Sequence, residues 1–401
     1  MAKIQTLHTV RIAERPNLIW LELETDDGLT GLGESFRGVQ AVEAVLHETV
    51  APWLIGRDAS QIEAVSRHLM TPYLGFHSSS AEVRAASAVD IALWDLAGQR
   101  HGIPVYEALG GGVRDSIKAY NTCAGYAYNS GGTRRSVGGQ DMPVGPYDDQ
   151  VAFMRDAGAL AESLVSEGFA AMKIWPFDGF AAATGGHMIS LPDLKTGLEP
   201  FHKVRRAVGD KIELMCELHS LWGMHAATRI CRALEDVGAF WAEDPIGKMD
   251  DARSLADLRR RTRTPICGSE TLAGTVPFRD LLAADALDVV MLDLAWCGGI
   301  TEGRKIAALA EAYNRPLAPH DCTGPVTLMA GLHLALHAPT AIFQEVVRAT
   351  LSTWYRELVT ELPVVTNGMV LAPQGAGLGT RLHPDVRQRE DVSVRTSGKA
   401  R

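Results

Sequence analysis

Long apolar runs and closely paired cysteines are missing from this sequence of 401 residues. No stretch approaches the ~20 apolar residues that a membrane-spanning helix needs. The net charge of −9 argues against nucleic acid or an anionic membrane as a partner. The opening segment, MAKIQTLHTVRIAERP, has no apolar core of the kind found in signal peptides, so we expect a cytoplasmic protein.

The six cysteines are scattered and never occur as Cys-x-x-Cys. In a long chain without a signal peptide, reduced thiols are expected rather than disulfides. Cys216, Cys267, Cys297 and Cys322 stand beside the polar residues considered next. One of them could be a catalytic thiol, but buried packing residues are the favoured interpretation.

What the sequence does contain is a series of acidic or imidazole side chains, each at the end of an apolar, strand-like run. They are Glu217, Glu243, Glu270, Asp293, His320 and Glu345, with gaps of 26, 27, 23, 27 and 25 residues. Each gap matches one strand, one helix and two loops, which predicts a (β/α)8-type barrel. The strand ends of such a barrel open on one face, so all six side chains would meet in one pocket.

The region before the barrel has a different pattern. Residues 3–12 and 17–25, and the segment ending near Glu34, read as three antiparallel strands, and three helical patterns follow as far as Gly102. Strands followed by helices without alternation predict a separate α+β domain, which we assign to residues 1–116.

The barrel is assigned to residues 117–362. The remaining segment, 363–401, contains short strand-like pieces with turn glycines. Its last residues, about 15 of them, are polar and are expected to be poorly ordered.

Three of the six strand-end residues are glutamates on consecutive strands: Glu217, Glu243 and Glu270. Three carboxylates together need a counter-charge, which a divalent cation would supply. Oxygen ligands suit Mg²⁺, with Mn²⁺ as a substitute, whereas zinc sites favour His and Cys. The alternative is that each glutamate is a solvated strand end, which the matched spacing disfavours.

The other polar residues suggest proton chemistry. Asp293 could accept a hydrogen bond from one imidazole nitrogen of His320 and make the other nitrogen more basic. Lys173, at the end of the second strand, could hold a substrate carboxylate. His219 stands two residues past the first glutamate, so strand alternation would turn it into the pocket as a general acid. Glu345 could donate a hydrogen bond to an enolate oxygen if it is held protonated.

Several segments together resemble the enolase superfamily, in its mandelate racemase subgroup, over nearly the whole chain: TDDGLTGLGES, SAVDIALWDLAGQRHGIPVYEALGG, WAEDPI, GSET, DLAWCGGITEGRKIAALAEA and PHD. The resemblance implies an α+β capping domain, completed by the C-terminal segment, on a modified (β/α)7β barrel. It implies removal of a proton α to a carboxylate, with the enediolate held on Mg²⁺. It makes the three glutamates the metal ligands, Asp293 and His320 the base dyad, and Glu345 the electrophilic partner.

Two residues depart from the family pattern. The leading metal ligand is usually Asp, but here it is Glu217, whose longer arm could shift the ion by about one methylene. Lys173 matches the first Lys of the family's Lys-x-Lys motif, but the second position is Trp175. Because Trp cannot take a proton, a two-base racemase is disfavoured. The additional His219 is similar to the acid-sugar dehydratases of the subgroup, including the galactonate type, in which this His protonates the departing 3-hydroxyl.

We therefore predict a hydro-lyase that removes the C2 proton of an aldonate or aldarate and eliminates its 3-hydroxyl, giving a 2-keto-3-deoxy acid. An epimerase, racemase or cycloisomerase using the same enediolate is the alternative. A non-catalytic homologue or a metal-dependent hydrolase fits these residues less well. The expected partner is a small sugar acid, and the resemblance implies a homo-oligomer, either a dimer or an octamer.

Substrate selection is expected to come from the capping domain and from two Gly-rich loops. The candidate residues and segments are Arg15, Phe36, Arg57, His77, 126–147 and 179–190.

Overall fold

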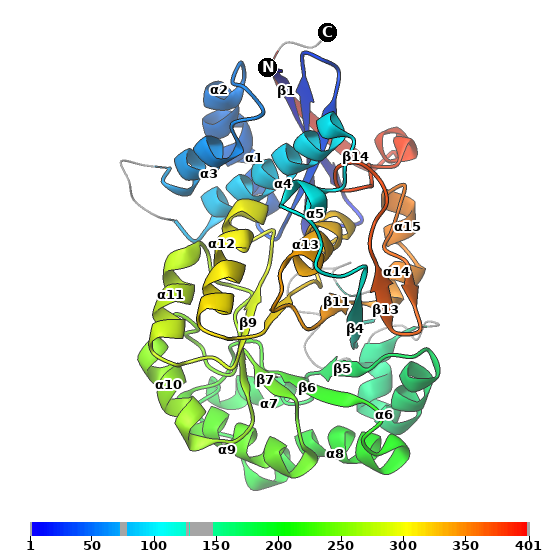
Figure 1. The fold of residues 1–401 in the computed structure, drawn as a ribbon. Coiled ribbons are helices and arrows are strands. Elements are labelled where there is room, and N and C mark those ends of the chain that lie inside the picture. The colour runs from blue at the N-terminus through cyan, green and yellow to red at the C-terminus, as the bar shows by residue number, and fades with distance from the viewer. Residues whose placement is uncertain (1, 73–77, 126–127, 129–146, 399–401) are drawn as a thin grey trace.

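The computed structural model describes residues 2–72, 78–125, 128 and 147–398 (Figure 1). Its first strands are β1 (Ile4–Ile12), β2 (Leu18–Thr25) and β3 (Thr30–Phe36). They form the predicted antiparallel sheet, but a fourth strand, β14 (Val392–Gly398), lies on its edge, and the order is β14-β1-β2-β3. We call this sheet, together with the helices that follow β3, the cap.

The cap helices begin with a continuous run of α1 (Val39–Ala44), the π-helical η1 (Val45–Val50) and α2 (Ala51–Leu54). They continue with α3 (Ile62–Met70), α4 (Ala81–His101) and α5 (Val105–Ala108). The long α4 lies directly on β3. A Cβ atom at Gly31 or Gly33 would come within 2.2 Å and 2.0 Å of α4 carbonyl oxygens, so only glycine allows this approach.

Eight parallel strands form the barrel: β4 (Ser116–Thr122), β5 (Ala171–Ile174), β6 (Glu213–Glu217), β7 (Trp241–Glu243), β8 (Ile266–Gly268), β9 (Val289–Leu292), β10 (Leu317–Pro319) and β11 (Gln344–Val346). Each pairs with the next from β4 to β10, and β11 pairs back with β4. A bridge between Leu317 and Ala341 joins β10 to the segment before β11 and closes the ring.

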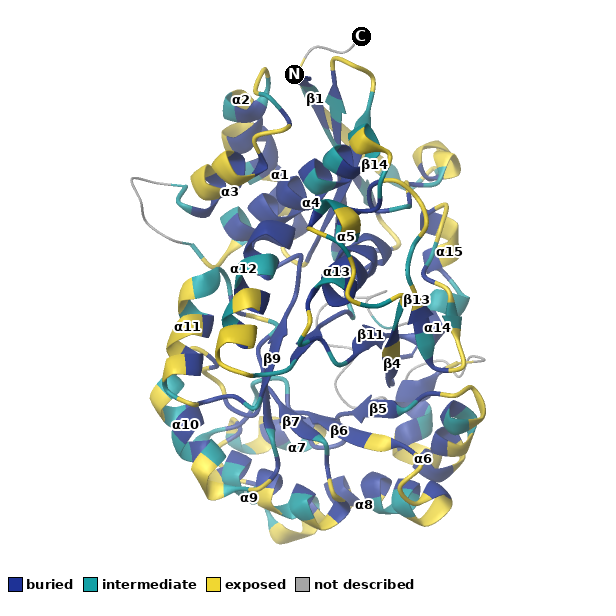
Figure 2. Ribbon diagram, in the orientation of Figure 1, coloured by how far each residue is buried: buried dark blue, intermediate teal, exposed yellow. Residues whose placement is uncertain are grey.

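Seven helices connect these strands: α6 (Asp149–Ser166), α8 (Leu191–Val208), α9 (Met224–Leu234), α10 (Ala252–Arg261), α11 (Thr275–Ala283), α12 (Gly299–Ala312) and α13 (Pro325–His337). Figure 2 shows that the strands are buried and that the helices expose their outer sides. The predicted (β/α)7β barrel with an N-terminal capping domain is confirmed.

Aromatic side chains fill part of the barrel interior. The Tyr120 ring lies edge-on to Trp241 at 5.5 Å and to Phe343 at 6.0 Å between centroids. All three side chains are buried. This packing makes the interior a core and leaves the chemistry to the strand ends.

The C-terminal segment first extends the barrel and then returns to the cap. After α14 (Arg348–Ser352) and α15 (Tyr355–Leu358), a hairpin of β12 (Val365–Thr366) and β13 (Met369–Leu371) pairs with β4. The chain passes through η4 (Pro384–Gln388) before β14 pairs with β1 along Thr6–Ile12.

The expectation of a poorly ordered C-terminus is therefore wrong for residues 392–398. Their polar side chains lie on a largely exposed edge strand, whose order comes from backbone hydrogen bonds to β1 rather than from apolar burial.

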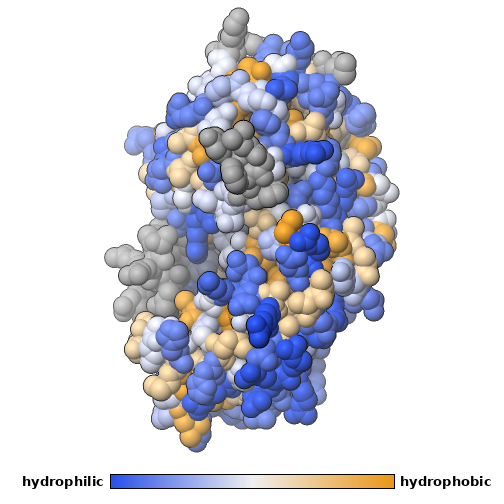
Figure 3. Space-filling model, turned by 90° about the vertical axis from the view of Figure 1, so that its left-hand side faces the viewer, coloured by the Kyte–Doolittle hydropathy of each residue, from blue (hydrophilic) through white to orange (hydrophobic). Residues whose placement is uncertain are grey.

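No described helix is both long enough and apolar enough to cross a bilayer. On the face drawn in Figure 3, hydrophobic residues are scattered among hydrophilic ones rather than gathered in one band.

Candidate active site

Three glutamates meet where β6, β7 and β8 end. Glu217 and Glu243 are the last residues of β6 and β7, and Glu270 follows β8 by two positions. One carboxylate oxygen from each lies within 4.8 Å of the other two. This all-oxygen set fits a hard divalent cation such as Mg²⁺ better than zinc.

Lys173, from β5, extends into the same cluster. Its Nζ lies 2.5 Å from Oε1 of Glu243, 3.0 Å from Oε1 of Glu345 and 3.7 Å from Oε2 of Glu217. Burial lowers the pKa of Lys173, but these carboxylates outweigh it and raise the pKa well above its usual value. Burial and the nearby Glu217 raise the pKa of Glu243. Lys173 thus offsets part of the negative charge of the carboxylate cluster, and a bound cation would offset more of it.

The longer arm of Glu217 is folded back on its own backbone. Its Oε1 accepts hydrogen bonds from the N–H groups of Leu218 at 2.9 Å and His219 at 2.6 Å. This leaves Oε2 toward Lys173 and the other carboxylates. The extra methylene is therefore taken up by a local turn, and the chain places a Glu where the family usually has Asp without losing the cluster.

His320 and Asp293 form a buried pair at the ends of β10 and β9. Nδ1 of His320 donates to Oδ2 of Asp293 at 2.8 Å, and the N–H of Ala295 fixes the other Asp293 oxygen at 2.7 Å. On its other side, Nε2 of His320 lies 2.8 Å from Oε2 of Glu270. Burial lowers the pKa of His320, but Glu270 and Glu345 raise it well above its usual value. The predicted dyad is thus assembled beside the carboxylate cluster.

His219 also lines the pocket, but strand alternation, the expected reason, does not put it there. Strand β6 ends at Glu217, and His219 has φ 48°, in the left-handed region, so strand alternation does not orient it. Its Nδ1 donates to Oδ2 of Asp178 at 2.7 Å, and its ring meets Trp175 edge-on at 5.6 Å. Burial lowers the pKa of His219, but Asp178 and Glu217 raise it to about 9.

Asp178 was missed by sequence reasoning. It is the first residue of the short helix α7 (Asp178–Ala181), 41 positions before His219. No spacing rule links residues this far apart, and the only signal was that the segment follows a barrel strand on the pocket side.

Glu345, from β11, is held by three donors. Its Oε1 accepts from Lys173 and from the hydroxyl of Thr122, and its Oε2 accepts from the N–H of Asp321 at 2.8 Å. Burial raises the pKa of Glu345, but Lys173 and His320 lower it below the usual value overall. These contacts favour the ionised form of Glu345, and its role as a protonated hydrogen-bond donor stays a prediction.

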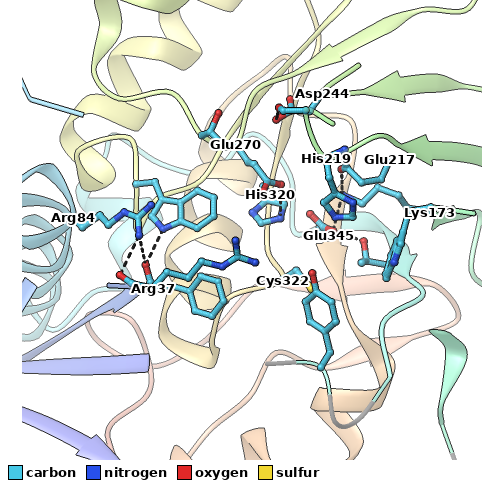
Figure 4. Close-up of a pocket in the computed structure, with 17 residues that line it drawn as sticks. Arg37, Arg84, Lys173, Glu217, His219, Asp244, Glu270, His320, Cys322 and Glu345 are labelled. Atoms are coloured by element: carbon cyan, nitrogen blue, oxygen red, sulfur yellow. Dashed lines mark hydrogen bonds and ion pairs between the residues drawn. The ribbon is translucent and has the colours of Figure 1, made fainter. Parts of the chain in front are cut away.

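These residues surround a cavity of about 200 Å³ that the cap closes from the other side (Figure 4). Phe36, Arg37 and Arg84 come from the cap, and Asp244 and Trp296 from the barrel. Of these, sequence analysis had singled out Phe36. Arg37 and Arg84 were missed because only the docking of the cap onto the barrel brings them to the pocket, whereas Asp244 and Trp296 lie in the loops that follow β7 and β9.

Other predicted substrate contacts are wrong. Arg15 pairs with Glu14 at 3.1 Å and lies over the Trp354 ring at 4.4 Å, away from the pocket lining. Arg57 lies over Trp53 at 3.8 Å in the cap. Segment 179–190 folds into α7, η2 (Ala182–Thr184) and the start of α8, and none of its residues lines the cavity.

Two further expectations fall partly or wholly on undescribed residues. His77 lies outside the described residues, and so does segment 126–147 apart from Tyr128 and Tyr147. Tyr128 lines the cavity.

None of the six cysteines forms a disulfide, as expected. Five are buried, and Cys322 lines the cavity. Burial raises the pKa of the Cys322 thiol well above its usual value, which disfavours the reactive thiolate form.

Two protein-family descriptions match this chain. "Mandelate racemase / muconate lactonizing enzyme, N-terminal domain" matches residues 4–110, and "Enolase C-terminal domain-like" matches residues 156–386. Among curated proteins, a D-galactonate dehydratase of Xanthomonas oryzae pv. oryzae is 31% identical, over 96% of this chain and 94% of the relative. A D-xylonate dehydratase of Haloferax volcanii is 28% identical, over 98% and 90%.

Two solved structures share this fold over nearly the full length of the chain. An enolase protein from Sargasso Sea environmental sequencing is 62% identical, with a TM-score of 0.90 and complete coverage of both chains. An enolase of the mandelate racemase subgroup from Agrobacterium tumefaciens is 49% identical, with a TM-score of 0.88 and 99% coverage of both.

Proposed function

The chain belongs to the mandelate racemase / muconate lactonizing enzyme family of the enolase superfamily, and we propose that it is a Mg²⁺-dependent dehydratase of a sugar acid. It is an enzyme of the carbon–oxygen lyase class, like its relatives named above. The product of the proposed reaction is a 2-keto-3-deoxy acid.

The observation that carries this proposal is the presence of two histidines on the pocket, each with its own buried carboxylate. His320 is held by Asp293 and His219 by Asp178, both through Nδ1. Dehydration needs one base at C2 and one acid at the 3-hydroxyl, which two separately oriented imidazoles can supply. Trp175 lines the pocket where a second lysine base would stand, so a two-base exchange at C2 is disfavoured.

The proposed proton transfer uses residues that line the pocket. Lys173 holds a carboxylate oxygen of the substrate with its ammonium group. In its neutral form, which a cation held by Glu270 would favour because it would offset the charge of that carboxylate, His320 removes the C2 proton through Nε2, and Asp293 stabilises the resulting imidazolium. Glu217, Glu243 and Glu270 would hold Mg²⁺, which would stabilise the negative charge that develops on the carboxylate.

The second histidine completes the elimination. Asp178 and Glu217 raise the pKa of His219 to about 9, which favours the protonated form that a general acid needs. Its Nδ1 is bound to Asp178, which leaves Nε2 to donate that proton to the departing 3-hydroxyl. Asp178 thus orients the acid as Asp293 orients the base.

The first test is a screen of purified protein with Mg²⁺ against stereochemically complete C4–C6 aldonic and aldaric acids. The 2-keto-3-deoxy product is detected as its semicarbazone. We expect dehydration by the wild type, and none by His320→Asn, because the C2 proton is then not removed. His219→Asn should stop dehydration but keep C2 exchange in D2O, followed by NMR.

The outcomes separate the alternatives. Exchange at C2 by the wild type without dehydration of any sugar acid would point instead to an epimerase or cycloisomerase. Near-full dehydration by His320→Asn would overturn the assignment of the base. His225→Asn, on helix α9 and outside the pocket lining, is the matched control and should behave like the wild type.

Several further points remain predictions. They are Mg²⁺ rather than Mn²⁺, a cytoplasmic location and assembly into a dimer or octamer. We likewise propose the division into a capping domain at 1–116, a barrel at 117–362 and a C-terminal segment at 363–401 that returns to the cap.

A further inference from the structure

Two arginines of the cap line the pocket opposite the carboxylate cluster. Arg37 follows β3 directly, and Arg84 lies in the first turn of α4. Figure 4 shows the Arg37 side chain extending into the pocket toward His320. The cap therefore brings positive charge to a site whose acidic groups all come from the barrel.

Arg84 is fixed in place. Its Nη1 donates to the carbonyl oxygens of Phe36 and Arg37, each at 3.0 Å, and its guanidinium lies 5.0 Å from the Trp296 ring centroid. The same Phe36 carbonyl accepts from Nε1 of Trp296 at 3.2 Å. These bonds hold the backbone at Arg37, which has φ 62°, in its left-handed conformation.

Aromatic rings connect this corner to the proposed base. The Trp296 ring stacks on His320 at 6.1 Å and on Phe36 at 6.0 Å, and the Arg37 guanidinium lies 5.3 Å from the Phe36 ring centroid. Trp296 and Phe36 thus connect His320, the proposed base, to the Arg37 guanidinium through successive ring contacts.

The two ends of the pocket differ in how their charges are satisfied. The carboxylates of Glu243 and Glu345 are paired with Lys173, and that of Glu270 is paired with His320. Within the part of the chain that the structure describes, neither Arg37 nor Arg84 forms an ion pair with a carboxylate, and Arg37 makes no side-chain hydrogen bond. A guanidinium fork supported on an aromatic face is suited to a carboxylate.

We infer that the substrate is a dicarboxylic sugar acid, an aldarate, whose distal carboxylate binds Arg37 while its reacting carboxylate lies at Lys173. Arg84 supports this contact by fixing the Arg37 backbone and by adding positive charge beside it. This inference rests on the proposed dehydratase function and narrows it, because an aldonate has an uncharged hydroxymethyl group at that end.

The test compares pairs of acids that share all stereocentres and differ only in the terminal group, carboxylate or hydroxymethyl. kcat/KM for dehydration is measured with Mg²⁺ for the wild type, Arg37→Met and Arg37→Lys. We expect the wild type to prefer the aldarate. Arg37→Met should lower kcat/KM roughly 10- to 100-fold on the aldarate, the usual effect of losing a charged hydrogen bond, and should leave the aldonate nearly unchanged.

Arg37→Lys separates the effect of charge from that of geometry, because it keeps the positive charge but loses the forked guanidinium. Its loss of kcat/KM on the aldarate should therefore lie between those of the wild type and Arg37→Met. Arg57→Met is the matched control, since Arg57 is also an exposed cap arginine stacked on an aromatic ring but lies outside the pocket lining. It should match the wild type on both acids, and thermal unfolding checks that every variant is folded.

Two results would overturn the inference and are distinguishable. If aldonates are dehydrated as well as or better than their aldarates, and Arg37→Met affects both alike, the distal carboxylate site is wrong while the dehydratase function stands. If no acid of either kind is dehydrated or exchanged at C2, the proposed function fails, and the inference fails with it.

Discussion

His333 shows how one buried side chain can connect separate parts of the fold. It lies on α13 with no exposed surface, its Nδ1 accepts from the N–H of Tyr106, and its Nε2 donates to the carbonyl of Leu378, both at 3.2 Å. Only a neutral ring makes both bonds. Burial lowers the pKa of His333 to about 4.

This predicts a pH-dependent loss of stability. Between pH 6.5 and 4 the unfolded chain binds a proton at this position that the folded protein does not, so the free energy of unfolding falls as the pH falls through this window. His333→Gln should be less stable at pH 7 but should lose about 2 kcal/mol less than the wild type on going from pH 7 to pH 5.

Urea unfolding at the two pH values measures this difference. His337→Gln, on the same helix but only partly buried, serves as the control and should keep the wild-type pH dependence. Equal pH dependence in wild type and His333→Gln would contradict the prediction.

The positions of some site residues can be predicted from the sequence, and those of others cannot. The strand-end positions of Glu217, Glu243 and His320 follow from periodicity, because a parallel barrel brings all strand ends to one face. Asp178 and Arg37 could not be predicted, since their places depend on a short helix and on the docking of the cap. The orientation of His219 was predicted for the wrong reason, because the backbone turns sharply just after Glu217.

Among the elements, β14 has the clearest consequence for stability. It pairs with β1 along seven positions, and the Ser397 and Thr396 hydroxyls contact His47 and His8. Deleting residues 392–401 would leave the β1 edge unpaired, so we expect a loss of about 2–4 kcal/mol and a tendency to aggregate.

Chemical denaturation and light scattering measure these two effects. Deleting only residues 399–401 is the control, because it keeps every β14 pair. A 392–401 deletion as stable as this control would show that β14 contributes nothing to the cap.

The regular elements were predicted well where hydrophobic periodicity was strong, as in β1, β2 and α4. β14 was missed because its burial pattern is almost wholly exposed, so no apolar alternation marks it. β14 is ordered because it pairs with β1, and the sequence of β14 itself gives no sign of that pairing.

For the whole molecule, the carboxylate cluster predicts that Mg²⁺ stabilises the fold. A ligand that binds only the folded state at 100 times its Kd adds about 2.7 kcal/mol, which for a chain of this size raises Tm by roughly 2–5 °C. Glu243→Gln removes a central member of the cluster and should lose this shift.

Differential scanning calorimetry of each variant with EDTA and with Mg²⁺ tests this prediction. The quantity compared between variants is the Mg²⁺-induced shift in Tm, not the absolute Tm. Glu199→Gln, at an exposed pair with Arg206, should retain the full shift. An undiminished Mg²⁺ shift in Glu243→Gln would place the cation elsewhere.

The pairing of β14 with β1 also places Gly398 opposite Thr6, so strands from the two ends of the described chain lie side by side (Figure 1). During synthesis the ribosome makes β1 before the barrel and β14 after it. The edge of β1 therefore lacks its partner while the whole barrel emerges, and the cap sheet is completed only when β14 has been made. A nascent chain stalled before residue 392 would carry an open strand edge, which makes this edge a natural point for chaperone protection.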